Sequence, residues 1–256
     1  MRKLMEHDLS TELEVFRGRF ERRYFLGGSL SSLAAMVLLN GARSLAQTAD
    51  HAWLSKPDKL GWDEFLKLSV PVAQQLTADP AFSVDEYLYR LASLATRLSE
   101  IPDTRLGPYS SVDPRVSFGP SFRGTPFFII QWRMEPGAFL PPHNHPNASV
   151  CTLAYEGEME LRNFEIIGEA PDYASKQSFR LRETRSEIMT RGRINTLAPV
   201  RDNIHCFRSG KQGARGIDIS TMHGKMAPFS FLEISERPIR SENRVFEAVW
   251  RPELGQ

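Results

Sequence analysis

Apolar residues recur at helical spacing in two stretches between residues 62 and 98. The first stretch covers residues 62–76 and contains Pro71, which interrupts the register of its apolar positions. The second begins with a capping box, in which the Ser83 side chain and the Glu86 side chain satisfy free backbone amides reciprocally. Its apolar positions then follow at i, i+3 and i+4: Val84, Tyr87, Leu88, Leu91, Leu94, Ala95 and Leu98. We expect two helices that cover the body of the protein and have no catalytic part.

From about residue 104 the pattern changes to short runs of β-branched and aromatic residues separated by Pro and Gly. The runs that we predict as strands are Phe127–Trp132, Ser149–Tyr155, Met159–Ile167, Phe179–Leu181, Ile194–Leu197, Ile204–Phe207, Arg215–Ser220 and Arg244–Trp250. Residues 168–192 are charged and irregular, and we predict a loop or an extra hairpin there. Many short strands after an opening helical region predict an all-β sandwich or barrel with an N-terminal helical segment.

The first 46 residues have the three-part layout of an export signal. A basic pair, Arg22-Arg23, precedes a short apolar stretch at residues 25–39, and the small residues Ser44 and Ala46 flank Leu45. The Arg-Arg-x-Phe-Leu core resembles the bacterial twin-arginine signal. It departs from that signal at Glu21, where Ser or Thr is usual, and at Gly27, where Lys is common.

Two other interpretations of the N-terminal segment stay open, namely a helix that packs on the body and an uncleaved anchor. A membrane span needs roughly 20 apolar residues, and this stretch is shorter and rich in glycine. We therefore expect cleavage after Ala46 and a periplasmic protein. The expected organisation is an export signal at 1–46, a linker and helical cover at 47–103, and the barrel at 104–256.

The charge balance argues against nucleic-acid binding. The chain of 256 residues carries 32 basic and 31 acidic residues, a formal net charge of +1 without a long block of one sign. We expect a small molecule or a short peptide as the partner, and no stable membrane span. The sequence does not indicate an oligomeric state.

Cys151 and Cys206 lie in apolar, strand-like segments. Free cysteine in such a segment behaves as a small buried hydrophobe, and two cysteines in a chain of this length do not form a disulfide framework. We expect two buried thiols, and a Cys151–Cys206 bridge in an oxidising compartment is the alternative.

His143 and His145 are separated by a single residue. Alternate side chains of a strand point to the same face, so this pair directs two imidazoles at one point. Gly137 lies six residues before His143, and Gly157 lies twelve residues after His145. This arrangement resembles the first metal motif of cupin proteins. The position at which most cupins carry a glutamate ligand is Val150 or, with a loop one residue shorter, Ser149, and neither supplies a carboxylate.

A third ligand must then come from another part of the chain. The segment from Pro199 to His205 resembles the second cupin motif, although the central glycine is missing and one residue is added. The expected ligand set is His143, His145 and His205. A site of imidazoles with open positions suits Fe, Zn, Cu or Ni, and the lack of a carboxylate favours an anionic ligand such as a thiolate.

Two short segments carry a more specific resemblance. Residues 142–146 (Pro-His-Asn-His-Pro) and 203–208 (Asn-Ile-His-Cys-Phe-Arg) resemble the two metal motifs of the cysteamine dioxygenase and plant cysteine oxidase family. The likeness runs from about Phe118 to Ser220. It implies a cupin (double-stranded β-helix, jelly-roll) barrel that binds Fe(II) through three histidines. It also implies that O2 is added to a small thiol or to an N-terminal cysteine, giving a sulfinic acid.

The same resemblance assigns a role to Asp218. The family has an acidic residue one strand beyond the third histidine, so Asp218 would support the metal ligands or contact a substrate amine. A solvent-facing aspartate at a strand end is the alternative. The chain departs from the family at residues 220–224 (Ser-Thr-Met-His-Gly), where a proline-proline-tyrosine segment is usual. His223 offers a polar group there, but no tyrosine is available for a cysteine–tyrosine crosslink.

Two other functions remain open from the sequence. One is a cupin enzyme that acts on a non-thiol substrate, such as a small oxygenated molecule. The other is a non-catalytic periplasmic cupin that binds a metal or a ligand as a sensor or carrier. Thiol-dependent oxygen uptake that is lost in His205→Ala separates the three.

Overall fold

The computed structural model describes residues 59–79, 81–109, 112–124, 127–224 and 229–255. The expected export signal and most of the expected linker, residues 1–58, lie outside this part of the chain. Residues 59–256 form one unit and are described by themselves. Within the described residues no helix is both long and apolar enough to span a bilayer.

Two helices precede the strands, as the apolar spacing predicts. Helix α3 (Trp62–Ala78) runs without a break through Pro71, which contradicts the expected interruption. Pro71 is exposed, so the carbonyl that loses its amide partner lies on the solvent side of the helix. Helix α4 (Val84–Ala95) begins at Ser83, whose side chain accepts a hydrogen bond from the Glu86 amide at 3.0 Å. The Ser83 half of the predicted capping box is confirmed, while the Glu86 carboxylate accepts a hydrogen bond from Arg90 at 2.7 Å.

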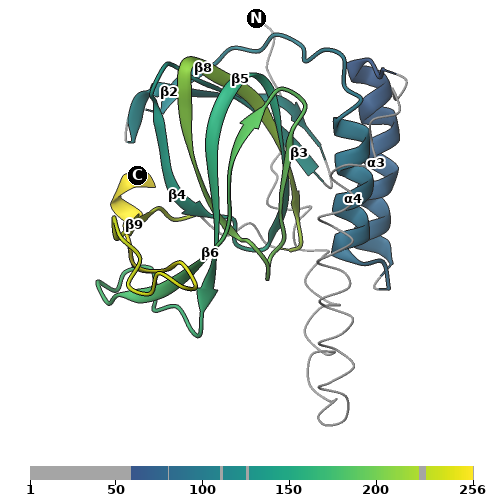
Figure 1. Ribbon diagram of the computed structural model, residues 1–256. Coiled ribbons are helices and arrows are strands. Elements are labelled where there is room, and N and C mark those ends of the chain that lie inside the picture. The colour runs from purple at the N-terminus through teal and green to yellow at the C-terminus, as the bar shows by residue number, and fades with distance from the viewer. Residues whose placement is uncertain (1–58, 80, 110–111, 125–126, 225–228, 256) are drawn as a thin grey trace, which may run out of the picture. The chain divides into compact units, whose positions relative to one another are not determined.

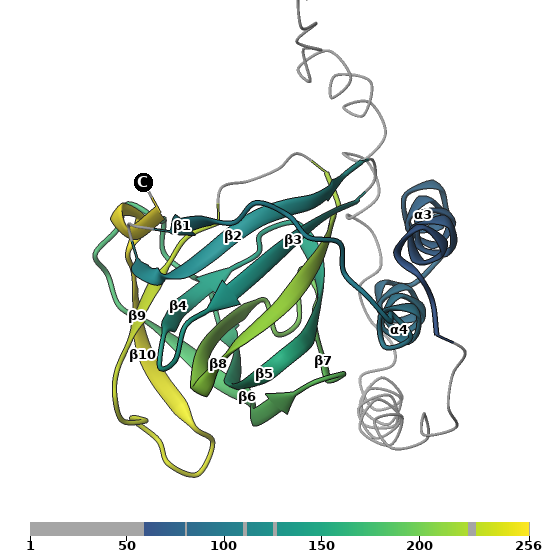
Figure 2. The ribbon, with the colours of Figure 1, turned by 90° about the horizontal axis from the view of Figure 1, so that it is seen from above.

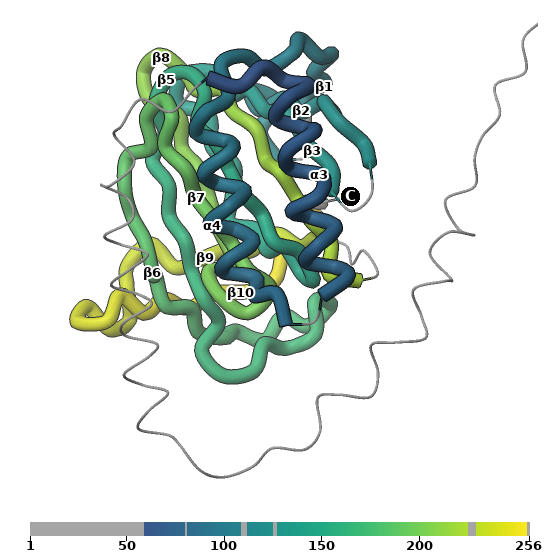
Figure 3. The backbone as a smooth tube through the Cα atoms, turned by 90° about the vertical axis from the view of Figure 1, so that its right-hand side faces the viewer, coloured from purple at the N-terminus to yellow at the C-terminus, as the bar shows by residue number. Residues whose placement is uncertain are grey.

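The apolar faces of α3 and α4 cover one face of the sheet. Figures 2 and 3 show the two helices side by side next to the strands. Phe65 from α3 and Tyr87 and Leu91 from α4 are fully buried. The sheet residues in the same apolar cluster are Phe127, Ile129, Cys151, Leu153, Ala198, Ile217 and Ile219. Burying these side chains holds the helical cover in place.

The rest of the unit is a curled antiparallel sheet (Figure 1). Its strands are β1 (Gly107–Tyr109), β2 (Asp113–Arg123), β3 (Phe127–Met134), β4 (Phe139–Asn144), β5 (Ala148–Ile167), β6 (Phe179–Thr190), β7 (Ile194–Leu197), β8 (Ile204–Met222), β9 (Leu232–Ile234) and β10 (Val245–Trp250). The order is β1-β2-β3-β8-β5-β6-β10-β9, with β4 on β8 and β7 on β5. A short 3-10 helix, η2 (Pro252–Gly255), follows. The predicted all-β class with an N-terminal helical segment is confirmed.

Strands β5 and β8 are long because each joins two of the predicted strands into one. They pair with each other along most of their length and bend where the register shifts around Gly157, which pairs with Ala214 and lies close to Gly213. Both glycines have positive φ, and a Cβ on Gly157 would lie 2.1 Å from the Gly213 carbonyl oxygen. Only glycine allows this approach. The bend lets β8 pair with β3 beyond it and with β4 before it.

The prediction of a loop or an extra hairpin at residues 168–192 is correct only in part. Strand β6 extends from Phe179 to Thr190 and pairs with β5 over most of its length. Its burial alternates along the strand, and its less exposed positions include the charged residues Glu183, Arg185 and Glu187. Charged residues on both faces concealed the strand in the sequence. Within residues 168–192, residues 168–178 and the turn at Arg191 and Gly192 lie outside regular structure.

Candidate metal centre

His143 lies in β4, opposite His205 in β8. The register between these strands shifts between Leu140 and His143, across Pro141-Pro142. Proline donates no amide hydrogen bond, so the two prolines favour a bulge at this point. The ring Nδ1 of His143 lies 2.9 Å from the Pro141 carbonyl oxygen. Because a carbonyl only accepts, the His143 proton is on Nδ1 and the lone pair is on Nε2.

His145 follows directly after β4 and is held by Asn203. Its amide donates to the Asn203 carbonyl at 3.1 Å, and the Asn203 side chain donates to the His145 carbonyl at 2.8 Å. The two-residue spacing still directs both imidazoles at one point, although His145 lies outside the strand. Asn203 stands two residues before His205 and therefore ties the two histidine segments together.

The three expected ligands lie together. The Nε2 atom of His205 is 3.0 Å from that of His143 and 2.9 Å from that of His145. Their ligand atoms all lie within 4.8 Å of one another, and His143 and His205 are buried. Among the described residues, no carboxylate or thiol joins this group.

These nitrogens are spaced as one ion requires. Two nitrogens about 2.1 Å from an ion and at right angles to each other lie about 3.0 Å apart. At a tetrahedral angle the separation rises to about 3.4 Å. The separations of His205 Nε2 from the other two Nε2 atoms, 2.9 and 3.0 Å, match the right-angled arrangement. The three histidines therefore fit a bound metal ion.

Burial keeps the three imidazoles neutral, which is the form that binds a metal. It lowers the pKa of His143 to about 4, despite the opposing effect of the Pro141 carbonyl. Burial also lowers the pKa of His145 and of His205 well below its usual value, and the neighbouring histidines lower both further.

Aromatic rings surround the cluster and limit its contact with water. The Phe207 ring lies 4.5 Å from the His205 ring, and the Phe231 ring lies 5.6 Å from the His143 ring. The Phe229 ring lies 6.1 Å from the His143 ring and is itself exposed. The environment of the cluster is apolar, and of its three histidines His145 alone is only half-buried.

Val150 and Ser149, the two candidates for the position at which most cupins carry a glutamate ligand, both lie in contacts of their own. Val150 is buried in a small apolar cluster with Ala148 and Leu197. The hydroxyl of Ser149 lies 2.7 Å from Nε2 of His223. His223 therefore takes a polar role away from the three-histidine group, of which it is no member.

Asp218 lies in the interior of β8 rather than at its end, and it is buried. Its neighbours Ile217 and Ile219 face the helical cover, so Asp218 faces the opposite side of the sheet, as Trp132 does. Burial raises its pKa to about 6, although the nearby donors Thr152 and Trp132 act in the opposite direction. Neither donor completes a hydrogen bond, and the Asp218 Oδ1 atom has no partner among the described residues. The solvent-facing alternative is wrong.

Sequence reasoning missed two asparagines. Asn195 in β7 and Asn163 in β5 are fully buried and exchange amide hydrogen bonds of 2.7 and 3.2 Å. Asn195 Nδ2 is 3.5 Å from Nδ1 of His205. The available signal was Asn195 two residues before Leu197, since alternate residues of a strand share one face and this places a polar side chain on the core face.

Both cysteines are free and buried, as expected for small hydrophobes. Cys151 packs under the helices and Cys206 belongs to another apolar cluster. Burial raises the pKa of the Cys206 thiol to about 12 and that of Cys151 further. The alternative of a Cys151–Cys206 bridge does not occur.

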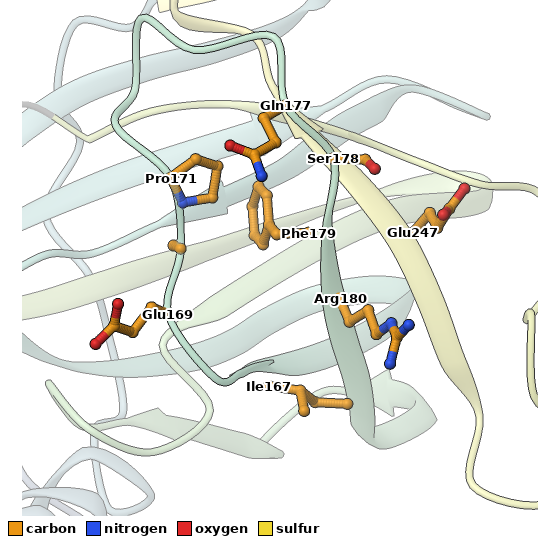
Figure 4. A pocket seen from close by; sticks show the side chains of 9 residues that line it. Ile167, Glu169, Pro171, Gln177, Ser178, Phe179, Arg180 and Glu247 are labelled. Carbon is orange, nitrogen blue, oxygen red and sulfur yellow. The ribbon is translucent and has the colours of Figure 1, made fainter.

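A surface depression lies near the ends of β5, β6 and β10 (Figure 4). Its lining residues are Ile167, Glu169, Ala170, Pro171, Gln177, Ser178, Phe179, Arg180 and Glu247. The charged side chains of Glu169, Arg180 and Glu247 are spread around it instead of pointing at one another. The histidine cluster does not line it, and we assign it no function.

The expected cupin fold class is confirmed by the curled antiparallel sheet and its strand order. The comparison with solved structures finds proteins of low similarity, among them a cupin domain. The polyketide cyclase RemF from Streptomyces resistomycificus is 16% identical, with a TM-score of 0.36 over 54% of this chain and 85% of its own. KdgF from Halomonas sp. is 13% identical, with a TM-score of 0.34 over 46% of this chain and 88% of its own. The Schizosaccharomyces pombe Cnp3 cupin domain is 14% identical, with a TM-score of 0.34 over 48% of this chain and 72% of its own. Similarity at this level assigns no activity, and no family model or curated protein matches the chain.

Proposed function

We propose that this protein is an Fe(II)-dependent thiol dioxygenase. The reaction joins a thiol and O2 to give a sulfinic acid, RSH + O2 → RSO2H, so both oxygen atoms enter the product. The observation that carries the proposal is the group of three imidazoles with no carboxylate among the described residues, in which His205 Nε2 lies 2.9 and 3.0 Å from the other two Nε2 atoms.

The charge of the site supports a thiol substrate. Three neutral imidazoles leave the full +2 charge of a bound ion uncompensated in an apolar environment. An anionic ligand is therefore favoured, and a metal ion deprotonates a coordinating thiol. A carboxylate ligand, as in most cupins, would remove part of this preference.

Bound iron would supply the redox chemistry and neighbouring positions for the thiolate and O2. The protein's residues hold and orient: the Pro141 carbonyl fixes the His143 ring, and Asn203 fixes the His145 backbone. Phe207 and Phe231 exclude water from the reacting groups. Effective positioning of two reactants alone accounts for a large part of many rate enhancements.

Asp218 is proposed to bind the amino group of an aminothiol or of an N-terminal cysteine. Its buried carboxylate has an oxygen without a partner, and an ammonium group would satisfy it. Asp218→Asn should raise the KM for cysteamine and leave that for a thiol without an amino group unchanged. Equal effects on both thiols would remove this role.

The test combines metal analysis with oxygen uptake. Iron-loaded protein is supplied with cysteine, cysteamine or a peptide that begins with cysteine, and the product is identified by a mass gain of two oxygen atoms. We expect thiol-dependent uptake that is lost in His205→Ala and kept in His223→Ala, a matched histidine outside the group. Metal binding without turnover would indicate a carrier or sensor, and turnover of non-thiols another enzyme class; either result overturns the proposal.

We also propose that the protein is exported to the periplasm by the twin-arginine route. The support is the sequence of residues 1–46, which lie outside the described part of the chain. Replacing Arg22 and Arg23 with lysine should retain the protein in the cytoplasm. Mass spectrometry of the exported protein should show a new N-terminus at Gln47, and an intact N-terminus there would contradict cleavage.

A further inference from the structure

The ring of His205 has a second contact that its role as a ligand does not explain. Its Nδ1 atom lies 3.5 Å from the Asn195 amide nitrogen. Asn195 is fully buried and is paired with Asn163 through both of its amide atoms. The state of this amide pair therefore decides which ring nitrogen of His205 carries the proton.

Without an ion, the contacts favour a proton on Nε2 of His205. His143 presents a bare Nε2, because its proton is held at Nδ1 by the Pro141 carbonyl. Two bare nitrogens 3.0 Å apart would repel, whereas Nε2–H of His205 donates to His143. Nδ1 of His205 is then an acceptor, and the Asn195 NH2 group donates to it.

A bound ion reverses every one of these roles. It needs the lone pair of Nε2, so the proton of His205 must be on Nδ1. Nδ1–H requires an acceptor, and Asn195 provides one only when its amide oxygen faces His205. A half-turn of the Asn195 amide achieves this, and a matching half-turn of Asn163 preserves both hydrogen bonds of the pair.

We propose that the Asn163–Asn195 pair inverts when a metal binds and thereby sets the tautomer of His205. This inference rests on the proposed metal site. His205 is neutral in both states: one proton leaves Nε2 and one joins Nδ1, so the ring undergoes no net protonation. Asn195 acts through His205 and is a positioning residue.

Arg185 gives the two arrangements unequal energies. Its Nη1 donates to the Asn195 Oδ1 atom at 3.3 Å, while its Nη2 binds Glu187 at 2.7 Å. After inversion, Arg185 faces the Asn195 NH2 group instead, and two donors oppose each other. Arg185 therefore favours the arrangement without metal and lowers the affinity of the site.

The direct test is the tautomer of His205, measured by long-range 1H–15N correlation on the 15N-labelled protein. Metal-free protein is compared with protein loaded with Zn(II), a diamagnetic probe. We expect Nε2–H without metal and Nδ1–H with Zn(II). Zn(II) binding with Nδ1–H in both states overturns the inversion but leaves the metal site intact. No Zn(II) binding overturns the inference and the metal site together.

Affinity for Zn(II), measured by competition with a chelator, tests the same idea in variants. Asn195→Leu removes the acceptor and should weaken binding about 10–100-fold. Asn195→Asp accepts only, so it should keep wild-type affinity or exceed it and show Nδ1–H even without metal. A merely structural role predicts the opposite, because Asp would bury a charge and lose binding as Leu does.

Arg185→Met should strengthen Zn(II) binding about three- to tenfold, since it removes the donor that opposes inversion. The matched control is Arg182→Met on the same strand, whose partner is Glu165 and not an asparagine. The control should leave affinity unchanged. Equal affinities of wild type and Arg185→Met would remove Arg185 from the proposal, and weaker binding in Arg185→Met would overturn the inversion.

Discussion

The two faces of β3, β5 and β8 carry different kinds of buried side chains. The face under α3 and α4 is apolar, and the buried Tyr87 and Thr221 there are hydrogen-bonded to each other. Ser69 of α3 is the exception among the described residues, since its buried hydroxyl has no partner. The opposite face contains the histidine cluster and the unpartnered oxygen of Asp218. Buried polar groups without partners cost free energy and are retained where a ligand satisfies them. One face thus stabilises the fold, and the other is available for chemistry.

Removing a metal ligand should give the largest difference between the effect on the metal site and the effect on the helix-covered face. His205→Ala leaves two imidazoles and should weaken metal binding by more than the 10–100-fold typical of losing a supporting residue. The helical cover, on the other face, should keep its stability. Metal content and chemical unfolding measured on one preparation check this. Wild-type iron content in His205→Ala would contradict the assignment of the site.

The converse test changes a residue of the helical cover and leaves the metal site intact. Leu91→Ala empties a fully buried position on α4 and should lower the free energy of unfolding by about 2–5 kcal/mol. Metal affinity of the folded protein should not change. The partly exposed Leu68 of α3 offers a matched control, with an expected loss of less than about 0.5 kcal/mol. If Leu91→Ala weakened metal binding in folded protein, the faces would be coupled.

The sequence predicted the helix-covered face well because that face follows periodic rules. The cap at Ser83 and the apolar spacing of α4 were sufficient for its position. Most strands were found from their β-branched and aromatic runs. The three histidines were selected from spacing and resemblance, and the structure places them together.

What the sequence did not reveal depends on contacts between distant segments. Strand β2 contains Pro114 and Pro120, which indicate turns, and a register shift next to Pro120 accommodates the second. The junctions within β5 and β8 depend on the approach of Gly157 to Gly213, which no local pattern shows. The partnership of Asn195 with His205 likewise requires the folded sheet.

The pKa of Asp218 makes the stability of the protein depend on pH. This pKa is about 6 in the folded protein against 3.8 for the free side chain. Between these pH values the folded state binds more protons than the unfolded state, so stability falls as the pH rises through this window. The loss amounts to about 3 kcal/mol above pH 6.

Asp218→Asn should therefore be more stable than wild type at neutral pH and equally stable near pH 3. Asp113, whose pKa is lowered to about 2 by its hydrogen bond with Arg115, titrates in both proteins and cancels in the difference. Urea unfolding of metal-free protein from pH 3 to pH 8 measures that difference. A difference that does not change with pH would mean that Asp218 is not desolvated.

The smallest expected effect tests whether polar pairing under the helices is only structural. Tyr87 of α4 and Thr221 of β8 are hydrogen-bonded and buried, and burial raises the pKa of the Tyr87 hydroxyl. Tyr87→Phe leaves the Thr221 hydroxyl unpaired and should cost about 1–3 kcal/mol. Adding Thr221→Val removes the orphaned group, so the double variant should recover most of that loss. Metal affinity should stay at the wild-type value in all three variants, because Thr221 faces the helices while Asp218 and the histidines face the opposite side. A double variant that is no more stable than Tyr87→Phe, or any loss of metal affinity, would show that this pair supports the metal face after all.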